Sequence, residues 1–357
     1  MIGYYAHHRG AGHLNRAMSI ARELHDDVTI LSSSPRPDNW TGGWVDLPLD
    51  HSAHDHDPAA DATAHGALHW APLGSNGLLA RTGVITDWLR RYTPSAVVVD
   101  VSVEIALLVR LHGIPVVYVA QPGDRSDSAH SLGYRASSAI IAVWPPAVDA
   151  LTVADDIAPR IEAVGAISRI PTVAPLPREP DQIAVLAGLG THGVSALDAA
   201  VAEARRAMPD ARWVILSGAD SATVAHTLRT SALVFAHCGE NALAEIAASR
   251  VPAIIVPEAR PHDEQYAMGR ALAASDMPVA VVEARDGGGF GPNPPDWAQL
   301  ARETAALDGE AWSVWCDGDA ARRAAAIVTR VAQLSSFPEP AASDASRAIA
   351  RPTTGAA

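Results

Sequence analysis

The residues best suited to chemistry stand in three glycine-rich turns, each of which follows an apolar run. The first turn reads His7-His8-Arg9-Gly10-Ala11-Gly12-His13. Gly10 and Gly12 permit a tight turn into a helix, and the free N–H groups at a helix start bind anions. His13 would lie at the mouth of that helix. Three histidines around such a turn meet no packing need, so we predict a functional role for them. The alternative is a plain β–α turn whose histidines face solvent.

The second turn follows the apolar run Ile183–Ala187 and reads Gly188-Leu189-Gly190-Thr191-His192-Gly193. It matches the Gly-x-Gly-x-x-Gly pattern of dinucleotide-binding folds. That pattern also needs an acidic residue at the end of the next strand, but the run that ends at Leu216 is followed by serine and glycine. We therefore predict that Gly190 and Thr191 face a phosphate or a cleft, in preference to a nicotinamide site.

The third turn carries the richest combination, Ala236-His237-Cys238-Gly239-Glu240-Asn241-Ala242, with Glu245 one turn further along the same helix. The amides near Asn241 would form an anion cradle, and Glu245 could accept hydrogen bonds from a vicinal diol. The loop after the next strand brings three polar side chains to the same crevice: Asp263, Glu264 and Gln265. A phosphate cradle, a diol acceptor and a polar group together suit a sugar nucleotide. The alternative is an ordinary helix start beside a polar loop.

Short apolar runs alternate with helical patterns along the chain, and these elements must position the three turns. In the first half we predict strands over Ile2–Ala6, Val28–Ser32, Ala96–Asp100, Val116–Ala120 and Ile140–Val143. In the second half we predict them over Ile183–Ala187, Trp213–Leu216, Leu233–Ala236, Ala253–Val256 and Val279–Val282. The helical patterns between them include Asn15–Leu24, Leu78–Tyr92, Val103–His112, Ser195–Met208 and Asn241–Ser249. The runs show no apolar–polar alternation, which is typical of strands buried on both faces of a parallel sheet.

A proline-rich segment separates the two halves. Four prolines within Ile167–Pro180 exclude both a helix and a central strand. We predict a first domain over residues 1–166, a linker over 167–181, a second domain over 182–317, a helix over 318–335 and a disordered tail over 336–357. The fold class is α/β, with two doubly wound Rossmann-like domains that face each other across a cleft.

Composition excludes several classes of function. The net charge of −13 argues against nucleic acid as a partner. All 27 basic residues are arginine, so no Schiff base, pyridoxal phosphate anchor or P-loop lysine can form. Two cysteines, Cys238 and Cys316, suit a reducing compartment. No apolar run approaches the roughly 20 residues of a membrane span, so we expect a soluble cytoplasmic protein without a transmembrane segment.

A run of histidines and aspartates could hold a metal ion. Its members are His51, His54, Asp55, His56 and Asp57. Their spacing lacks the fixed i, i+4 pattern of a helical site, and prolines stand on both sides of the run. We predict that this run is a loop that faces solvent or a second substrate, in preference to a zinc site, and we predict no bound metal.

The third turn resembles the donor-binding signature of GT-B glycosyltransferases. Plant-type family 1 enzymes carry His-Cys-Gly-Trp-Asn-Ser, a glutamate eight residues after the histidine, and later an acidic residue followed by glutamine. This chain has His237 to Ala242, Glu245 at the same spacing, and Glu264-Gln265. The turn at Gly10–His13 resembles the Gly-x-Gly-His turn of family 28 relatives, including the peptidoglycan N-acetylglucosaminyltransferase. The resemblance covers residues 1–334. It departs where glutamate replaces the tryptophan and alanine replaces the serine.

The resemblance implies a role for each site residue. His237 and the amides of Gly239, Glu240, Asn241 and Ala242 would hold the diphosphate. Glu245 would bind the ribose hydroxyls, and Glu264 with Gln265 the hydroxyls of the donor sugar. His13 would be the general base, supported by Asp100 or Glu104.

These roles predict an inverting, metal-independent hexosyltransferase. It would move a sugar from a nucleoside-diphosphate sugar, UDP-linked, to the hydroxyl of a small-molecule, polymer or lipid-linked acceptor. The nucleotide sugar is a co-substrate, and no separate cofactor is implied. Two alternatives stay open: a nucleotide-sugar epimerase or hydrolase of the same fold, and a non-catalytic nucleotide-sugar-binding protein, which the changes at Glu240 and Ala242 keep in view.

Overall fold

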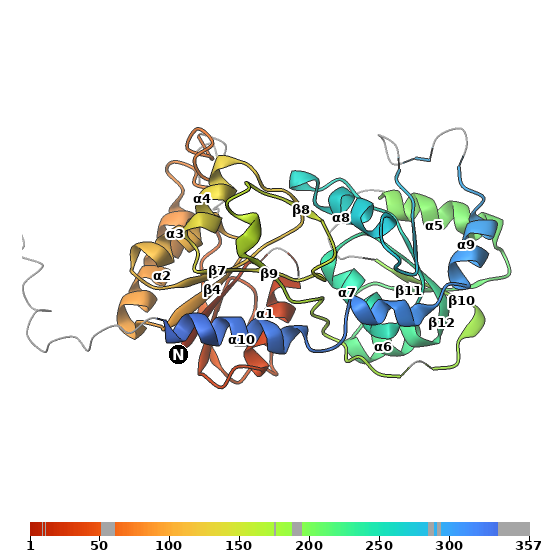
Figure 1. Cartoon of the computed structure of the whole chain (residues 1–357), viewed down its shortest axis with the longest axis horizontal. Coiled ribbons are helices and arrows are strands. Elements are labelled where there is room, and N and C mark those ends of the chain that lie inside the picture. The colour runs from red at the N-terminus through yellow and green to blue at the C-terminus, as the bar shows by residue number, and fades with distance from the viewer. Residues whose placement is uncertain are drawn as a thin grey trace, which may run out of the picture.

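The computed structural model describes residues 1–8, 10, 12–50, 61–174, 176–187, 195–284, 289–290 and 294–334. These residues form two α/β lobes that lie side by side (Figure 1). We call them the N-terminal lobe, built around a seven-stranded sheet, and the C-terminal lobe, built around a five-stranded sheet. Every strand pair in both sheets is parallel, so the predicted α/β class is confirmed.

The sheet of the N-terminal lobe has the strand order β3-β2-β1-β4-β5-β7-β9. Its strands are β1 (Ile2–Ala6), β2 (Val28–Ser32), β3 (Gly43–Asp46), β4 (Ala96–Asp100), β5 (Val116–Val119), β7 (Ala139–Ala142) and β9 (Ile161–Ala163). The order runs outward from β1 in both directions, as in doubly wound folds. Every residue of β1, β2, β4, β5 and β7 is buried, which is why these strands are apolar without alternation.

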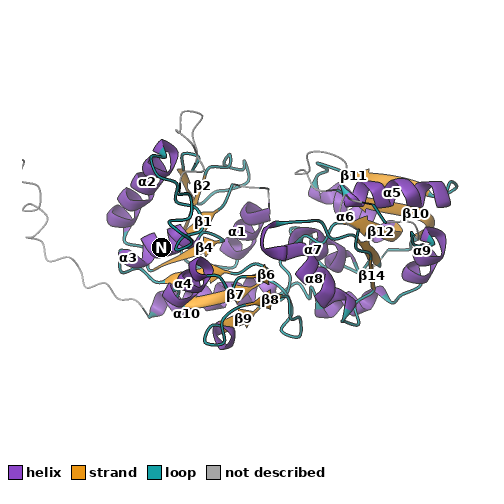
Figure 2. Ribbon diagram, turned by 90° about the horizontal axis from the view of Figure 1, so that it is seen from above, coloured by secondary structure: helices purple, strands orange, loops and turns teal. Residues whose placement is uncertain are grey.

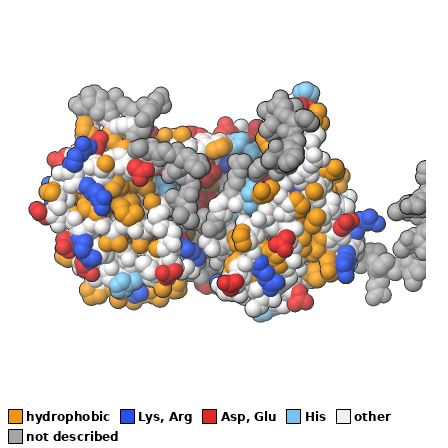
Figure 3. Space-filling view, turned by 180° about the vertical axis from the view of Figure 1, so that it is seen from behind, with side chains coloured by type: hydrophobic (Ala, Val, Ile, Leu, Met, Phe, Trp, Pro, Cys, Tyr) orange, Lys and Arg blue, Asp and Glu red, His pale blue; other side chains and the backbone are white. Residues whose placement is uncertain are grey.

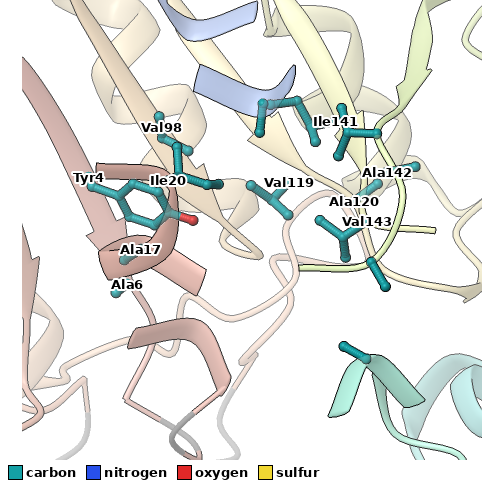
Figure 4. Close-up of a cluster of buried hydrophobic side chains, with 14 of the residues drawn as sticks. Tyr4, Ala6, Ala17, Ile20, Val98, Val119, Ala120, Ile141, Ala142 and Val143 are labelled. Atoms are coloured by element: carbon teal, nitrogen blue, oxygen red, sulfur yellow. The ribbon is translucent and has the colours of Figure 1, made fainter. Parts of the chain in front are cut away.

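The helices of this lobe are α1 (Gly12–Arg22), α2 (Asn76–Tyr92), α3 (Val103–Leu111) and α4 (Ser128–Ala136), with a 3₁₀ turn at Ala158–Arg160. Ser75 and Ser102 cap α2 and α3 by accepting hydrogen bonds from amides of the first turn. α1 places Ala17 and Ile20 in the same core cluster as Tyr4 (Figure 4). A two-stranded sheet, β6 (Gly123–Asp124) and β8 (Leu151–Thr152), completes the lobe.

The sheet of the C-terminal lobe has the order β11-β10-β12-β13-β14. Its strands are β10 (Glu179–Leu186), β11 (Arg212–Leu216), β12 (Ser231–Ala236), β13 (Ala253–Ile255) and β14 (Val279–Val281). The helices are α5 (Ala196–Ala207), α6 (Ser221–Thr230), α7 (Glu240–Ser249), α8 (Glu264–Ala273) and α9 (Trp297–Ala305), with 3₁₀ turns at Pro261–Asp263 and Gly309–Val314. Seen from above, α7 and α8 face α1 and β6 of the other lobe (Figure 2).

The last described helix, α10 (Ala320–Gln333), returns to the N-terminal lobe (Figure 1). It packs against α1 and the strands β4, β5 and β7. The Nε of Arg323 donates to the carbonyl of Val164 at 2.8 Å, and Arg330 pairs with Glu162. The chain therefore enters the C-terminal lobe and leaves it again beside its point of entry.

Strands with long apolar runs match the sequence predictions best. β1, β2 and β4 have the predicted bounds, and the other predicted strands differ only at their ends. Four further strands, β3, β6, β8 and β9, were not predicted because they are short and none is fully buried. None of the described helices combines the length and the apolar character that a membrane crossing requires.

Candidate active site

His13 and Asp100 form the centre of the candidate site in the N-terminal lobe. His13 is the second residue of α1, and Asp100 ends β4, where it pairs in register with Ala6 at the end of β1. Nδ1 of His13 lies 3.0 Å from Oδ1 of Asp100, within hydrogen-bond distance. The hydroxyl of Tyr4 donates to the other carboxylate oxygen at 3.3 Å. The parallel sheet therefore brings the two predicted groups together at the carboxyl ends of adjacent strands.

The environment of Asp100 favours its ionised form although the side chain is fully buried. Burial alone would raise the pKa of this carboxyl. The positive charge of Arg16, together with His13 and the hydrogen bond from Tyr4, outweighs burial and lowers the pKa below its usual value. An ionised carboxylate on Nδ1 holds the proton on that nitrogen and leaves Nε2 as the acceptor.

Glu104, the other acid predicted as a partner of His13, serves a different purpose. Its Oε1 accepts hydrogen bonds from the backbone amides of His69 at 2.7 Å and Trp70 at 2.8 Å. Its Oε2 accepts from the hydroxyl of Ser102 at 3.3 Å. Glu104 therefore fixes the segment before α2, and the structure pairs His13 with Asp100 instead.

Arg16 was missed by the sequence reasoning, although it is central to the site. Its side chain is 4% exposed. Nη1 lies 3.4 Å from Oδ1 of Asp100, and Nη2 donates at 3.0 Å to Oε2 of Glu240 on the other lobe. Burial opposes the charged form of Arg16, but the two carboxylates raise its pKa. Its position three residues after His13, on the same face of a helix, was the available signal.

The start of α7 faces the start of α1 across the two lobes. Gly239 occupies the N-cap position of α7, and no side chain of the described residues caps it. The amide of Gly239 donates to Nδ1 of His237 at 3.1 Å, so this histidine orders the turn itself. A Cβ atom on Gly12 would lie 2.0 Å from Nδ2 of Asn241, so only glycine permits this approach. Two helix starts with free N–H groups therefore meet in one place.

Gly10 is the other glycine that the first turn requires. Its φ of +83° lies in the left-handed region, which side-chain-bearing residues rarely adopt. Before it in the chain, the rings of His7 and His8 stack with centroids 4.6 Å apart, and the ring centroid of His7 lies 5.9 Å from that of His13. Burial, with the neighbouring His13 and His8, lowers the pKa of His7 to about 3. His7 is therefore a neutral ring at the edge of the site.

Glu264 and Arg125 make a second contact between the lobes. Nη2 of Arg125 lies 3.6 Å from Oε2 of Glu264, which is the first residue of α8. Burial raises the pKa of the Glu264 carboxyl, although Arg125 and His13 act in the opposite direction. Red and pale blue side chains, the acids and histidines, gather in the hollow between the lobes (Figure 3).

Gln265 and Asp263 flank Glu264 but do not share its position. Oε1 of Gln265 accepts from the amides of Cys238 at 3.1 Å and Glu258 at 3.0 Å, so it joins the loops that follow β12 and β13. Asp263 instead accepts from Nη2 of Arg270 at 2.7 Å in an exposed ion pair. Of the three predicted polar residues, Glu264 is therefore the one in contact with the opposite lobe.

Glu245 lies on α7 and is bonded to the segment that connects the lobes. Nε of Arg169 donates to Oε1 of Glu245 at 2.5 Å. Burial raises the pKa of the Glu245 carboxyl, against the effect of Arg169. Arg169 also lines a cavity of about 300 Å³ between this connecting segment and the start of α10, together with Ile167 and Cys316. The predicted diol acceptor thus already holds a cationic partner.

Two groups of described residues have the composition of a metal site. His69, His130 and His262 converge from three segments, and His7, His8 and Asp50 form the other group. In the first group, Nδ1 of His130 lies 2.6 Å from Oδ2 of Asp127, and Arg125 donates to Nε2 of His130 at 3.3 Å.

Some residues that the sequence predicted lie outside the described part of the chain. These are Gly190 and Thr191, and the run from His51 to Asp57.

Comparison with known proteins identifies the fold. No model of a known protein family matches the sequence, and no curated protein matches it. Solved structures do match. The spinosyn rhamnosyltransferase SpnG has a TM-score of 0.61 at 16% identity, over 94% of this chain and 100% of its own. The glycosyltransferase VinC, in complex with dTDP, has a TM-score of 0.60 at 16% identity, with 94% and 100% covered. MurG of Acinetobacter baumannii has 0.59 at 16% identity, with 92% and 99% covered. The chain has the GT-B fold of these glycosyltransferases.

Proposed function

We propose that this protein is a glycosyltransferase that moves a hexosyl group from a nucleoside-diphosphate sugar, UDP-linked, to the hydroxyl of an acceptor. The observation that carries the proposal is the His13–Asp100 pair, with its 3.0 Å contact, opposite the open start of α7. A base and an anion cradle on facing lobes are the two parts that transfer between an acceptor and a phosphorylated sugar needs. The GT-B fold supports the same conclusion.

The first step assigned to the site is proton removal from the acceptor. With Asp100 holding the proton on Nδ1, Nε2 of His13 accepts the proton of the acceptor hydroxyl. Asp100 then stabilises the imidazolium that forms. The acceptor oxygen attacks the anomeric carbon from the side opposite the diphosphate, the bond to the diphosphate breaks, and the configuration inverts.

The second step is departure of the nucleoside diphosphate. Its charge would be held by the first-turn amides of α7, the N-terminal end of that helix dipole, and the nearby guanidinium of Arg16. This supply of positive potential supports a mechanism in which no metal bridges the diphosphate. Glu264, which pairs with Arg125 across the interface, would accept hydrogen bonds from the donor sugar.

A direct test incubates the purified protein with UDP-glucose, UDP-N-acetylglucosamine or dTDP-glucose, with and without a panel of hydroxyl acceptors, and measures products by mass. A glycosylated acceptor supports the proposal. Free sugar or an epimer without acceptor would instead indicate the hydrolase or epimerase alternative. Donor binding without turnover across the panel would indicate a binding protein.

The role of His13 has its own test. His13→Ala should abolish most of the transfer rate while the protein still binds UDP. His25→Ala changes an exposed histidine just after the same helix and serves as the matched control. A His13→Ala protein with the full transfer rate would contradict the assignment of the base.

A further inference from the structure

One carboxylate oxygen of Glu240 is buried and has no hydrogen-bond partner in the part of the chain that the structure describes. Its side chain is 9% exposed, and Oε2 accepts the hydrogen bond from Arg16. Oε1 has almost no solvent-accessible surface and no hydrogen-bond partner among the described residues. Buried polar atoms are nearly always hydrogen-bonded, and an unmet one is costly. The position therefore suits either a proton on Oε1 or a ligand atom beside it.

Glu240 is also the first residue of α7, so its carboxyl stands at the start of the helix. The free amides of that first turn are the groups that would hold the donor diphosphate. A carboxylate and a diphosphate would then share one small volume between the lobes. Two like charges at such a distance destabilise each other strongly.

The groups around Glu240 contain more carboxylates than guanidinium groups. Arg16 and His13 face it from α1, Asp100 from the end of β4 and Glu264 from α8. Tyr134 on α4 is also within electrostatic reach. Three carboxylates here are set against the guanidinium of Arg16 and, beside Glu264, that of Arg125. A diphosphate would add further negative charge, so its binding favours the neutral form of one of these acids.

Glu240 is the acid best placed to become neutral. Burial, and the charges of Glu264 and Asp100, raise its pKa to about 7 in spite of Arg16. Asp100, by contrast, has a lowered pKa and three hydrogen-bonding partners in Tyr4, His13 and Arg16.

We propose that Glu240 takes up a proton when the donor diphosphate binds, and that the protonated carboxyl donates a hydrogen bond to a diphosphate oxygen. The inference rests on the proposed function, because it places a nucleoside diphosphate at the start of α7. It assigns to Glu240 a substrate-binding role that depends on its protonation state.

Proton uptake can be counted by isothermal titration calorimetry with UDP, using phosphate and Tris buffers whose ionisation enthalpies differ. The experiment compares the wild-type protein with Glu240→Gln at pH 8, where free Glu240 is mostly ionised. Glu240→Gln keeps the shape of the side chain and removes its titration. Ionisation of UDP itself contributes equally to both proteins and cancels in the difference. Glu23→Gln, which changes an exposed carboxylate after α1, is the matched control.

At pH 8 we expect the wild type and Glu23→Gln to bind more protons per UDP than Glu240→Gln, with a difference of at most about one proton. At pH 5.5 the difference should fall towards zero, because Glu240 is already protonated. The affinity of the wild type for UDP should decrease by up to about tenfold per pH unit above 7, relative to the variant. Equal proton uptake by the wild type and Glu240→Gln would overturn the inference.

The wild-type protein alone provides a second measurement if the variant does not fold. At pH 8, where UDP is itself fully ionised and contributes no proton change, the wild type should still take up as much as about one proton per UDP, and the absence of uptake at this pH overturns the inference. If neither UDP nor dTDP produces binding heat with the wild type, the proposed function fails. If UDP binds but the wild type and Glu240→Gln take up the same number of protons, this inference is wrong and the proposed function is unaffected.

Discussion

Arg16 on α1 donates at 3.0 Å to Glu240 on α7, and so the buried guanidinium of Arg16 bridges the two lobes of the molecule. The same guanidinium lies 3.4 Å from Asp100, the partner of His13. His13, the proposed base, and the start of the helix that would hold the diphosphate are therefore electrostatically connected. A change on one side of the interface should alter the other.

Asp100→Asn should reduce the transfer rate by about 10²- to 10⁴-fold, because the amide no longer stabilises the imidazolium or fixes the ring tautomer. Steady-state kinetics with the donor and acceptor found in the product assay would measure this loss. The affinity for UDP, measured by calorimetry, should change far less. Glu104→Gln is the matched control, since Glu104 bonds the amides of His69 and Trp70. An equal loss of rate in both variants would contradict the assignment.

Gly12→Ala should destabilise the protein by about 1–3 kcal/mol, because the added Cβ would lie 2.0 Å from Nδ2 of Asn241. Chemical unfolding measures the difference in free energy. The cost should shrink in an Asn241→Ala background, where the amide is gone, and a double-mutant cycle isolates that coupling. Purely additive effects of the two substitutions would show that the two helix starts do not press on each other in solution.

Glu245→Ala should weaken UDP and UDP-sugar by similar factors, if its carboxylate binds the ribose. Loss of a charged acceptor costs roughly 1.5–3 kcal/mol, or about 10- to 150-fold in affinity. Arg169 bonds the same carboxylate at 2.5 Å but has no assigned contact with the nucleotide. Arg169→Ala should therefore lower the affinity for UDP much less. Calorimetry on both variants compares them. Equal losses would mean that Glu245 acts through Arg169 and not on the nucleotide.

Glu264→Ala should leave the affinity for free UDP almost unchanged but weaken the sugar nucleotide and alter the preference among hexoses. The reason is that its carboxylate pairs with Arg125 of the opposite lobe, where we place the donor sugar. Asp263→Ala removes the neighbouring carboxylate, which is bonded to Arg270 on the surface, and is the control. If the Glu264 variant lost UDP and UDP-sugar affinity equally, the donor-sugar role would be wrong.

Glu240→Gln should change the pH dependence of stability. The pKa of Glu240 is raised to about 7 in the folded protein, whereas an exposed glutamate titrates near 4.5. Between these values the folded state holds a proton that the unfolded state has lost, so this group makes stability decline as pH rises. The decline across that window is on the order of 3 kcal/mol. Urea unfolding at pH 4.5 and pH 7.5 should show the decline in the wild type and a smaller one in the variant.

The sequence predicted the central strands well and the polar contacts poorly, for physical reasons. β1, β2 and β4 are fully buried, so their apolar composition marks both their positions and their bounds. β6 and β8 contain two residues each and leave no pattern to detect. Asp100 and Glu104 were equal candidates because both follow the same apolar run. The choice between them depends on the register of β4 with β1, which is a long-range property.

Arg16 and Gln265 illustrate the same limit within the site. A buried arginine on an amphipathic helix has the sequence signature of an exposed one, and its partner Glu240 is 224 positions away. Gln265 was assigned to the donor sugar by resemblance, but its Oε1 joins two backbone amides that come together only after both strands have formed. Both roles depend on partners that are distant in the sequence, and the one local signal, the spacing of Arg16 from His13, identifies neither of its carboxylate partners.

The return of α10 to the N-terminal lobe sets the order in which the chain can complete its structure. The C-terminal lobe is continuous in sequence, so all of its strands are synthesised before α10. The N-terminal lobe, although synthesised first, lacks the helix that contributes Ile327, Val328 and Val331 to its core. An apolar face on β4, β5 and β7 therefore stays uncovered until α10 has been made, so the N-terminal lobe cannot complete its core before the C-terminal lobe has been synthesised.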